Sequence, residues 1–82
     1  MDLTPNERLV LETVRDGVHS TVSQVAQASG LSHAAASINL RKLASFGYLS
    51  GYEVTLAGHK MLEGMPLKDS DLPDHRNIRP SL

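Results

Sequence analysis

Residues 21–49 read TVSQVAQASGLSHAAASINLRKLASFGYL, and their pattern is that of a helix, a tight turn and a second helix. Thr21 is a good N-cap for the first helix, and Gln24 three residues later completes a T-x-x-Q capping box. Gly30 is expected to end this helix, because glycine adopts backbone angles that other residues avoid. The chain is therefore predicted to turn directly after residue 29.

A second helix is predicted after this turn. Ser32 is a good N-cap for it, and the helix is expected to run to about Phe46, where Gly47 supplies the stop. Two helices joined by a short turn that contains glycine form a helix-turn-helix unit, whose second helix can enter the major groove of DNA.

The second helix has two different faces. At about 100° per residue, Ala36, Leu40 and Leu43 point the same way and are predicted to face the core. The residues on the opposite side are small, polar or basic, namely Ala34, Ser37, Ile38, Arg41 and Ser45. Serine and arginine donate hydrogen bonds to bases or phosphates, and isoleucine offers an apolar contact for a thymine methyl group. A solvated face rich in good helix formers would have the same composition, so this alternative stays open.

These motifs, taken in order, resemble the bacterial winged helix-turn-helix regulators, especially the MarR-like group. The residues that carry the resemblance are Gly30-Leu31-Ser32, Ala36-Ser37, Leu40, Leu43 and Phe46-Gly47-Tyr48-Leu49. Residues 53–60, EVTLAGHK, are similar to the strand that closes the wing and to the start of the helix that follows it. The resemblance covers about residues 4–63.

The resemblance implies a mainly α fold with a small β-hairpin. This winged helix-turn-helix domain would cover residues 1–64, with a three-helix core, a short wing and a short fourth helix. The tail over residues 65–82 is expected to be extended or disordered. Its alternative uses are a solvated end, an arm packed on a partner subunit, or a basic end that contacts DNA.

The implied function is that of a sequence-specific transcriptional regulator, with a recognition helix over about residues 33–46. We expect base contacts from Ser32, Ala34, Ser37, Ile38 and Arg41. We expect contacts to the DNA backbone from Thr21, Gln24, His33, Asn39 and Lys42. A homodimer is expected, and its two-fold symmetry predicts a palindromic site with half-sites about 34 Å apart.

Other segments are placed by local signals. A first helix is predicted to begin at the T-P-N-E box of residues 4–7 and to run to about Asp16. Leu9 lies off the apolar stripe of this helix, and a core position is favoured over a subunit contact. Residues 18–20 are expected to form a single short strand that pairs with the wing.

Residues 47–55 are predicted to form a tight hairpin around a Ser50-Gly51 turn. The loop is short and its tip has no cation, unlike a wing that enters the minor groove. Packing is therefore favoured over a phosphate contact for Tyr52. Thr55 is expected to cap a last helix over about residues 56–63.

Composition limits the class of protein. With 82 residues, the chain suits one small domain, and its 40% hydrophobic content favours a folded chain over a disordered one. The net charge of −1 argues mildly against a nucleic-acid partner. However, no Asp or Glu occurs between Gly17 and Tyr52, so the helix-turn-helix segment itself is weakly basic. With so few cations, a lone monomer is expected to bind DNA weakly.

Catalysis and membrane association are not expected. The chain has no cysteine, and its four histidines lack the spacing of metal ligands. No nucleophile motif or phosphate-binding loop occurs, so we expect no enzyme, no metal and no cofactor. Without a membrane span or a signal peptide, a cytoplasmic, nucleoid-associated protein of a bacterium or phage is expected. A small-molecule effector is not expected from the sequence.

One alternative function stays open beside DNA binding. A winged-helix module that binds another protein would use Ile38 and its small neighbours as an apolar docking patch. The near-neutral charge and the short wing favour this alternative.

Overall fold

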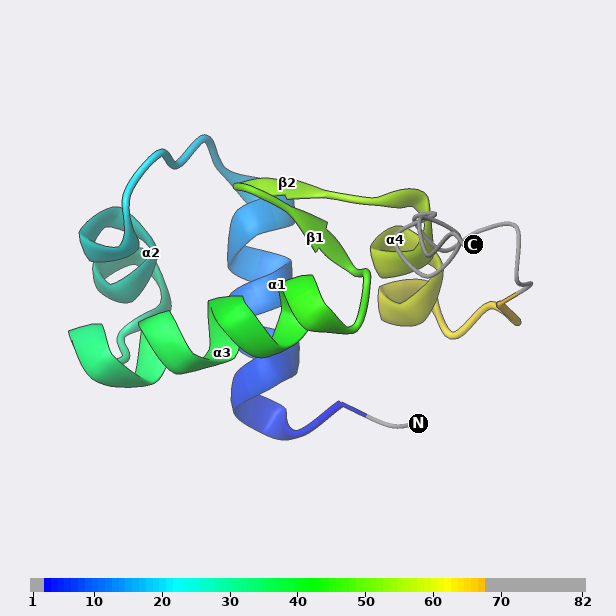
Figure 1. Cartoon of the computed structure of the whole chain (residues 1–82), viewed down its shortest axis with the longest axis horizontal. Coiled ribbons are helices and arrows are strands. Elements are labelled where there is room, and N and C mark those ends of the chain that lie inside the picture. Colours follow the sequence, from blue (N-terminus) through cyan, green and yellow to red (C-terminus); the bar gives the residue numbers. More distant parts are fainter. Residues whose placement is uncertain (1–2, 68–82) are drawn as a thin grey trace, which may run out of the picture.

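Helices dominate the structure, a computed structural model that describes residues 3–67 (Figure 1). The elements are α1 (Pro5–Asp16), α2 (Val22–Ser29), α3 (His33–Ser45), β1 (Leu49–Ser50), β2 (Glu53–Val54) and α4 (Leu56–Glu63). A mainly helical chain with a small antiparallel hairpin is therefore confirmed. The expectation for the tail lies, from residue 68 on, outside the described residues.

The helices begin at the caps that the sequence marks. Thr4 and Glu7 form a complete capping box: the Glu7 amide donates to Thr4 Oγ1 at 3.2 Å, and the Thr4 amide donates to Glu7 Oε1 at 2.9 Å. At α2 the box is incomplete. The Gln24 amide donates to Thr21 Oγ1 at 3.2 Å, but the Gln24 side-chain carbonyl accepts from the Ser20 amide at 2.7 Å. The predicted reciprocal box at Thr21 was wrong in one bond: the Gln24 side chain accepts from the amide of Ser20 instead of that of Thr21.

Glycines end three of these helices in the left-handed backbone region. Gly30 has φ +77°, and Gly47, directly after the last turn of α3, has φ +86°. At Gly47 the amides of Gly47 and Tyr48 donate to the carbonyls of Ala44 and Leu43 at 3.0 and 2.9 Å. This pair of bonds satisfies the free carbonyls at the end of α3 and turns the chain back into β1.

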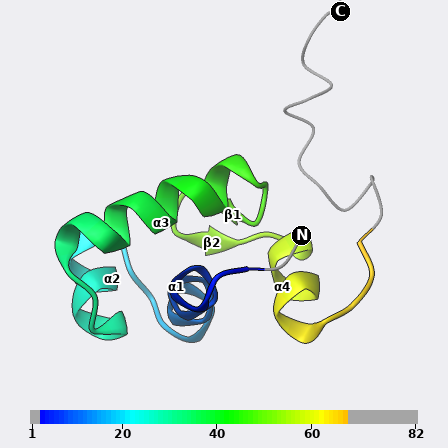
Figure 2. The ribbon, with the colours of Figure 1, turned by 90° about the horizontal axis from the view of Figure 1, so that it is seen from below.

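The core lies where α1 passes between the other elements. Figures 1 and 2 show α3 crossing α1, with α2 and α4 on opposite sides of α1. The buried apolar side chains are Val10, Leu11, Val14, Val25, Ala26, Ala36, Leu40, Leu43, Tyr48, Leu49, Ala57 and Leu62. The predicted core face of α3 is thus confirmed. Leu9 is half-buried and lies outside this cluster, so its favoured core position was wrong.

The hairpin consists of two residue pairs and a two-residue turn. Leu49 pairs with Val54 and Ser50 with Glu53, which leaves Gly51 and Tyr52 as the turn. The turn therefore begins one residue later than the predicted Ser50-Gly51 turn. Gly51 has φ +61°, an angle that glycine adopts without steric cost.

The strand predicted over residues 18–20 does not form. The His19 ring folds back instead, with Nε2 3.2 Å from the Thr13 carbonyl at the end of α1, and it lies against Gly17. Val18, beside it, is 99% exposed. An open groove of about 520 Å³ separates the loop from the hairpin.

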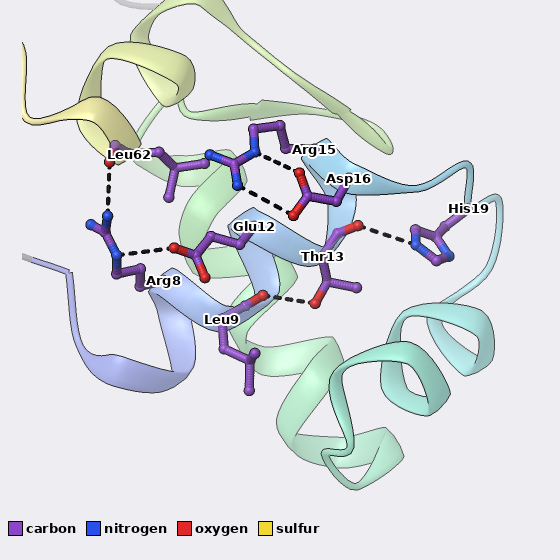
Figure 3. A network of polar contacts seen from close by, with 8 residues as sticks. All are labelled: Arg8, Leu9, Glu12, Thr13, Arg15, Asp16, His19 and Leu62. Carbon is purple, nitrogen blue, oxygen red and sulfur yellow. Dashed lines mark hydrogen bonds and ion pairs between the residues drawn. The ribbon is translucent and has the colours of Figure 1, made fainter.

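Helix α4 is fastened at both ends. Thr55 Oγ1 donates to the Gly47 carbonyl at 2.7 Å and accepts from the Gly58 amide at 3.1 Å, so it joins the end of α3 to the start of α4. At the other end, Arg8 Nη2 donates to the Leu62 carbonyl at 2.8 Å (Figure 3). Both contacts fix α4 beside the hairpin and α1.

Gly58 is the point of closest approach between α4 and the hairpin. A Cβ atom at this position would press on the Tyr48 carbonyl oxygen and lie 2.8 Å from Val54 Cγ1. We expect Gly58→Ala to lower the free energy of unfolding by about 1–3 kcal/mol through overpacking. Urea denaturation would measure this change.

The matched control is His59→Ala, on an exposed neighbour in the same helix. It is expected to change stability by less than about 0.5 kcal/mol. Equal denaturation midpoints for Gly58→Ala and the wild type would show that α4 does not pack closely on the hairpin.

Candidate nucleic-acid interface

The outward face of α3 is the candidate interface. The packing of α3 on α1 and α2 buries its apolar stripe, which leaves the other side in solvent. Exposed residues on or next to this face are Ser32, His33, Ala34, Ile38, Arg41, Lys42 and Ser45, and Ser37 is half-buried. Of the five residues predicted to contact bases, Ala34, Ser37, Ile38 and Arg41 lie on this side of α3, and Ser32 lies at its N-terminal end.

Arg41 is the cation at the middle of this face. Its Nη2 lies 3.5 Å from Ser37 Oγ, one turn earlier, which is a long and weak hydrogen bond. Among residues 3–67 Arg41 makes no ion pair. Most of the guanidinium donors are therefore open to an acceptor outside these residues.

Ile38 adds an apolar element to the same face. It is 50% exposed, and Ala34, one turn earlier, and Ser45, two turns later, are small. A single exposed apolar side chain is ordinary on a protein surface. Here it lies one turn before the exposed Arg41, so an apolar contact and a charged contact are adjacent on the face.

The helix N-termini contribute first-turn amides. Ser32 caps α3 by accepting from the Ala35 amide at 3.1 Å, and His33 is exposed at the first position of the helix. Thr21 and Gln24 are also exposed, but their side-chain oxygens are engaged in local hydrogen bonds. Contacts to phosphate from the start of α2 would therefore come mainly from backbone N–H groups.

Asn39 is a correction to the predicted set. Its side chain is 8% exposed, and Nδ2 donates to the Ala35 carbonyl at 2.8 Å. Asn39 lies three residues after Ala36 and four before Leu43, which places it within the buried stripe. It therefore supports α3 from inside and is removed from the residues proposed to contact DNA.

Many of the charged side chains lie on α1 rather than on α3. Arg8 Nε pairs with Glu12 at 3.1 Å, and Arg15 pairs with Asp16 at 2.8 Å (Figure 3). The hydrogen bonds from Arg15 hold the pKa of the Asp16 carboxyl below its ordinary value. Both pairs are largely solvent-exposed and contribute little stability. Helix α3 has Arg41 and Lys42 and no acidic residue, so it carries a small excess of positive charge.

A groove runs along the flank of α3 that faces α2 and the hairpin turn. Its volume is about 240 Å³, and its lining includes Val22, Leu40, Ala44 and Tyr52, with Ser37 and Arg41 at its polar part. Sequence spacing predicts neither Ala44 nor Val22 as part of the site. The groove is formed by residues of α2, α3 and the hairpin turn. Because these are far apart in the sequence, no local pattern predicts it.

Over residues 3–67, no cluster of three or more His, Asp or Glu side chains is arranged to hold a metal ion. None of the helices in that part has the length and the apolar run that crossing a bilayer requires.

No protein-family model, curated protein or solved structure matches this chain. The candidate site is therefore defined by its own geometry and charge.

The placement of Asn39 gives a stability prediction. Asn39→Ala is expected to lower the free energy of unfolding by about 1–2 kcal/mol, because it removes a buried hydrogen bond and leaves a void. Lys42→Ala, at an exposed position of the same helix, is expected to change it by less than about 0.5 kcal/mol. Thermal or urea unfolding would compare them. Unchanged stability in Asn39→Ala would contradict the structural role.

Proposed function

We propose that this chain is a winged helix-turn-helix regulator that binds double-stranded DNA through α3. The observation that carries the proposal is the exposed face of α3, which is small, polar and basic and holds a guanidinium that has no carboxylate partner within residues 3–67. The four helices and the short hairpin are compatible with a winged helix. The resemblance to MarR-like regulators in residues 30–60 supports the same fold.

In the proposed complex α3 lies in the major groove. Arg41 donates to a guanine or a phosphate, and Ile38 contacts a thymine methyl group. The remaining contacts to base edges come from Ser32, Ala34 and Ser37. His33, Lys42 and the first turn of α2, with Thr21 and Gln24, hold the DNA backbone.

We propose a homodimer, because one subunit offers few cations to DNA. One subunit offers Arg41, Lys42 and the exposed His33 near the proposed interface, so the salt-dependent part of its affinity is small. Two subunits related by a two-fold axis would double these contacts and select a palindrome with half-sites about 34 Å apart. Such a dimer would regulate a bacterial or phage promoter by blocking or recruiting polymerase.

A protein-binding module is the second candidate function. It is favoured by the 50% exposure of Ile38 among small residues, and by a hairpin turn, Gly51-Tyr52, that offers no cation to DNA. In this case the outward face of α3 would bury Ile38 against a partner protein.

Selection from a pool of random-sequence duplexes, followed by titration of the selected duplex, tests DNA binding. Arg41→Ala is expected to weaken binding of that duplex by about 1–3 kcal/mol, or roughly 5- to 150-fold. Ile38→Ala is expected to relax the base preference at one position. The matched control is Arg15→Ala, which removes the same charge from α1 and should leave affinity close to that of the wild type.

Two outcomes would contradict the proposal. Equal losses in Arg41→Ala and Arg15→Ala would mean that binding depends on net charge alone. A wild-type chain that enriches no duplex, together with a protein complex that Ile38→Glu disrupts, would favour the protein-binding module.

A further inference from the structure

The groove beside α3 extends the candidate interface beyond the outward face. It lies between the start of α2, the flank of α3 and the tip of the hairpin, and it shares Ser37 and Arg41 with the face described above. The two surfaces are therefore continuous, and a ligand on one would reach the other.

The groove has an apolar part and a positively charged part. Val22, Leu40, Ala44 and Tyr52 give it a mainly apolar surface, and the Arg41 guanidinium supplies the positive charge. None of the lining residues is acidic. An apolar body joined to an anion matches this division, whereas a free hydrated anion would gain little from the apolar part.

The position of the groove narrows the choice of ligand. A helix in the major groove is flanked by the two sugar-phosphate strands, so a strand must pass beside α3 if α3 enters that groove. Val22 is the first residue of α2, where backbone N–H groups have no partner within the helix. Val22 and Arg41 both line the groove, and free helix amides and a guanidinium each favour a phosphate.

We propose that this groove binds one sugar-phosphate strand of the duplex, with deoxyribose against Ala44 and Tyr52 and a phosphate at Arg41. The inference rests on the proposed DNA binding and assigns a role to the hairpin. The Gly51-Tyr52 turn forms one wall of the groove on the major-groove side. It therefore contacts the strand that borders α3 without entering the minor groove.

Ala44 allows a test that changes charge with little change in packing, because its side chain is exposed on the flank of α3. Ala44→Glu would place a carboxylate beside the phosphate, and Ala44→Lys an ammonium group. We expect Ala44→Glu to weaken binding of a random-sequence duplex pool about tenfold. We expect Ala44→Lys to strengthen it and to add about one unit to the salt slope.

The matched control is the same pair of changes at Ala28, an exposed alanine of α2 beside Thr13 and His19. Ala28→Glu and Ala28→Lys are expected to leave affinity within about twofold of the wild type, because charges far from the duplex are screened by salt. Circular dichroism and urea denaturation of all four variants would establish that each is folded.

A second measurement locates the phosphate. Single neutral methylphosphonates placed along the selected duplex would reveal one phosphate whose replacement cancels the gain of Ala44→Lys. If Ala44→Lys no longer strengthens binding once that phosphate is neutral, the lysine and the phosphate interact directly. A gain that survives every replacement would overturn the assignment.

The outcomes separate this inference from the proposed function. If Arg41→Ala weakens binding while both Ala44 variants bind as the wild type does, α3 binds DNA but the groove holds no strand. If Ala44→Glu and Ala44→Lys lose the same affinity, the size of the new side chain weakens binding and its charge has no effect. This result also overturns the phosphate assignment. If the wild-type chain binds no duplex, both proposals fail.

Discussion

The packing of α3 against α1 determines which side of α3 meets solvent. Leu43 and Ala36 are fully buried in this contact region, together with Val10 and Leu11 of α1. A helix with one apolar stripe has little freedom to rotate about its own axis without exposing that stripe. The direction in which the Arg41 and Ile38 side chains point is therefore set by the packing of the core. No further contact is needed to orient the candidate interface.

The end of α3 transmits this constraint to the rest of the chain. Gly47 reverses the backbone directly after the helix, and its carbonyl accepts from Thr55 Oγ1 at 2.7 Å. One hydroxyl thus links the last turn of α3, the closing strand of the hairpin and the first turn of α4. The position of the hairpin beside α3, and with it the groove, depends on this short chain of contacts.

The sequence was sufficient for features that depend on neighbours in the chain. Caps such as Thr4 with Glu7, and the stops at Gly30 and Gly47, involve residues within one helical turn of each other. The prediction for Asn39 was wrong because a polar side chain favours solvent, whereas its spacing from Ala36 places it in the buried stripe, where Nδ2 bonds to the Ala35 carbonyl. The strand expected at residues 18–20 was wrong for a different reason. The His19 ring contacts the end of α1, and that contact exists only once the chain has folded.

The candidate site shows the same division. The outward face of α3 follows from helical periodicity, so its members could be listed from the sequence. The groove beside it requires Val22, Ala44 and Tyr52, which come from three elements, and no spacing rule connects them.

The two-residue turn of the hairpin has a further consequence for the thermodynamics of association. A long surface loop that becomes ordered on binding loses conformational entropy worth about 1–2 kcal/mol for each residue fixed. Here the Ser50–Glu53 pair leaves only Gly51 and Tyr52 between the strands, and Tyr52 already packs against the core. A partner that docks on this side meets a preformed wall, so the entropic penalty of ordering a flexible wing is absent.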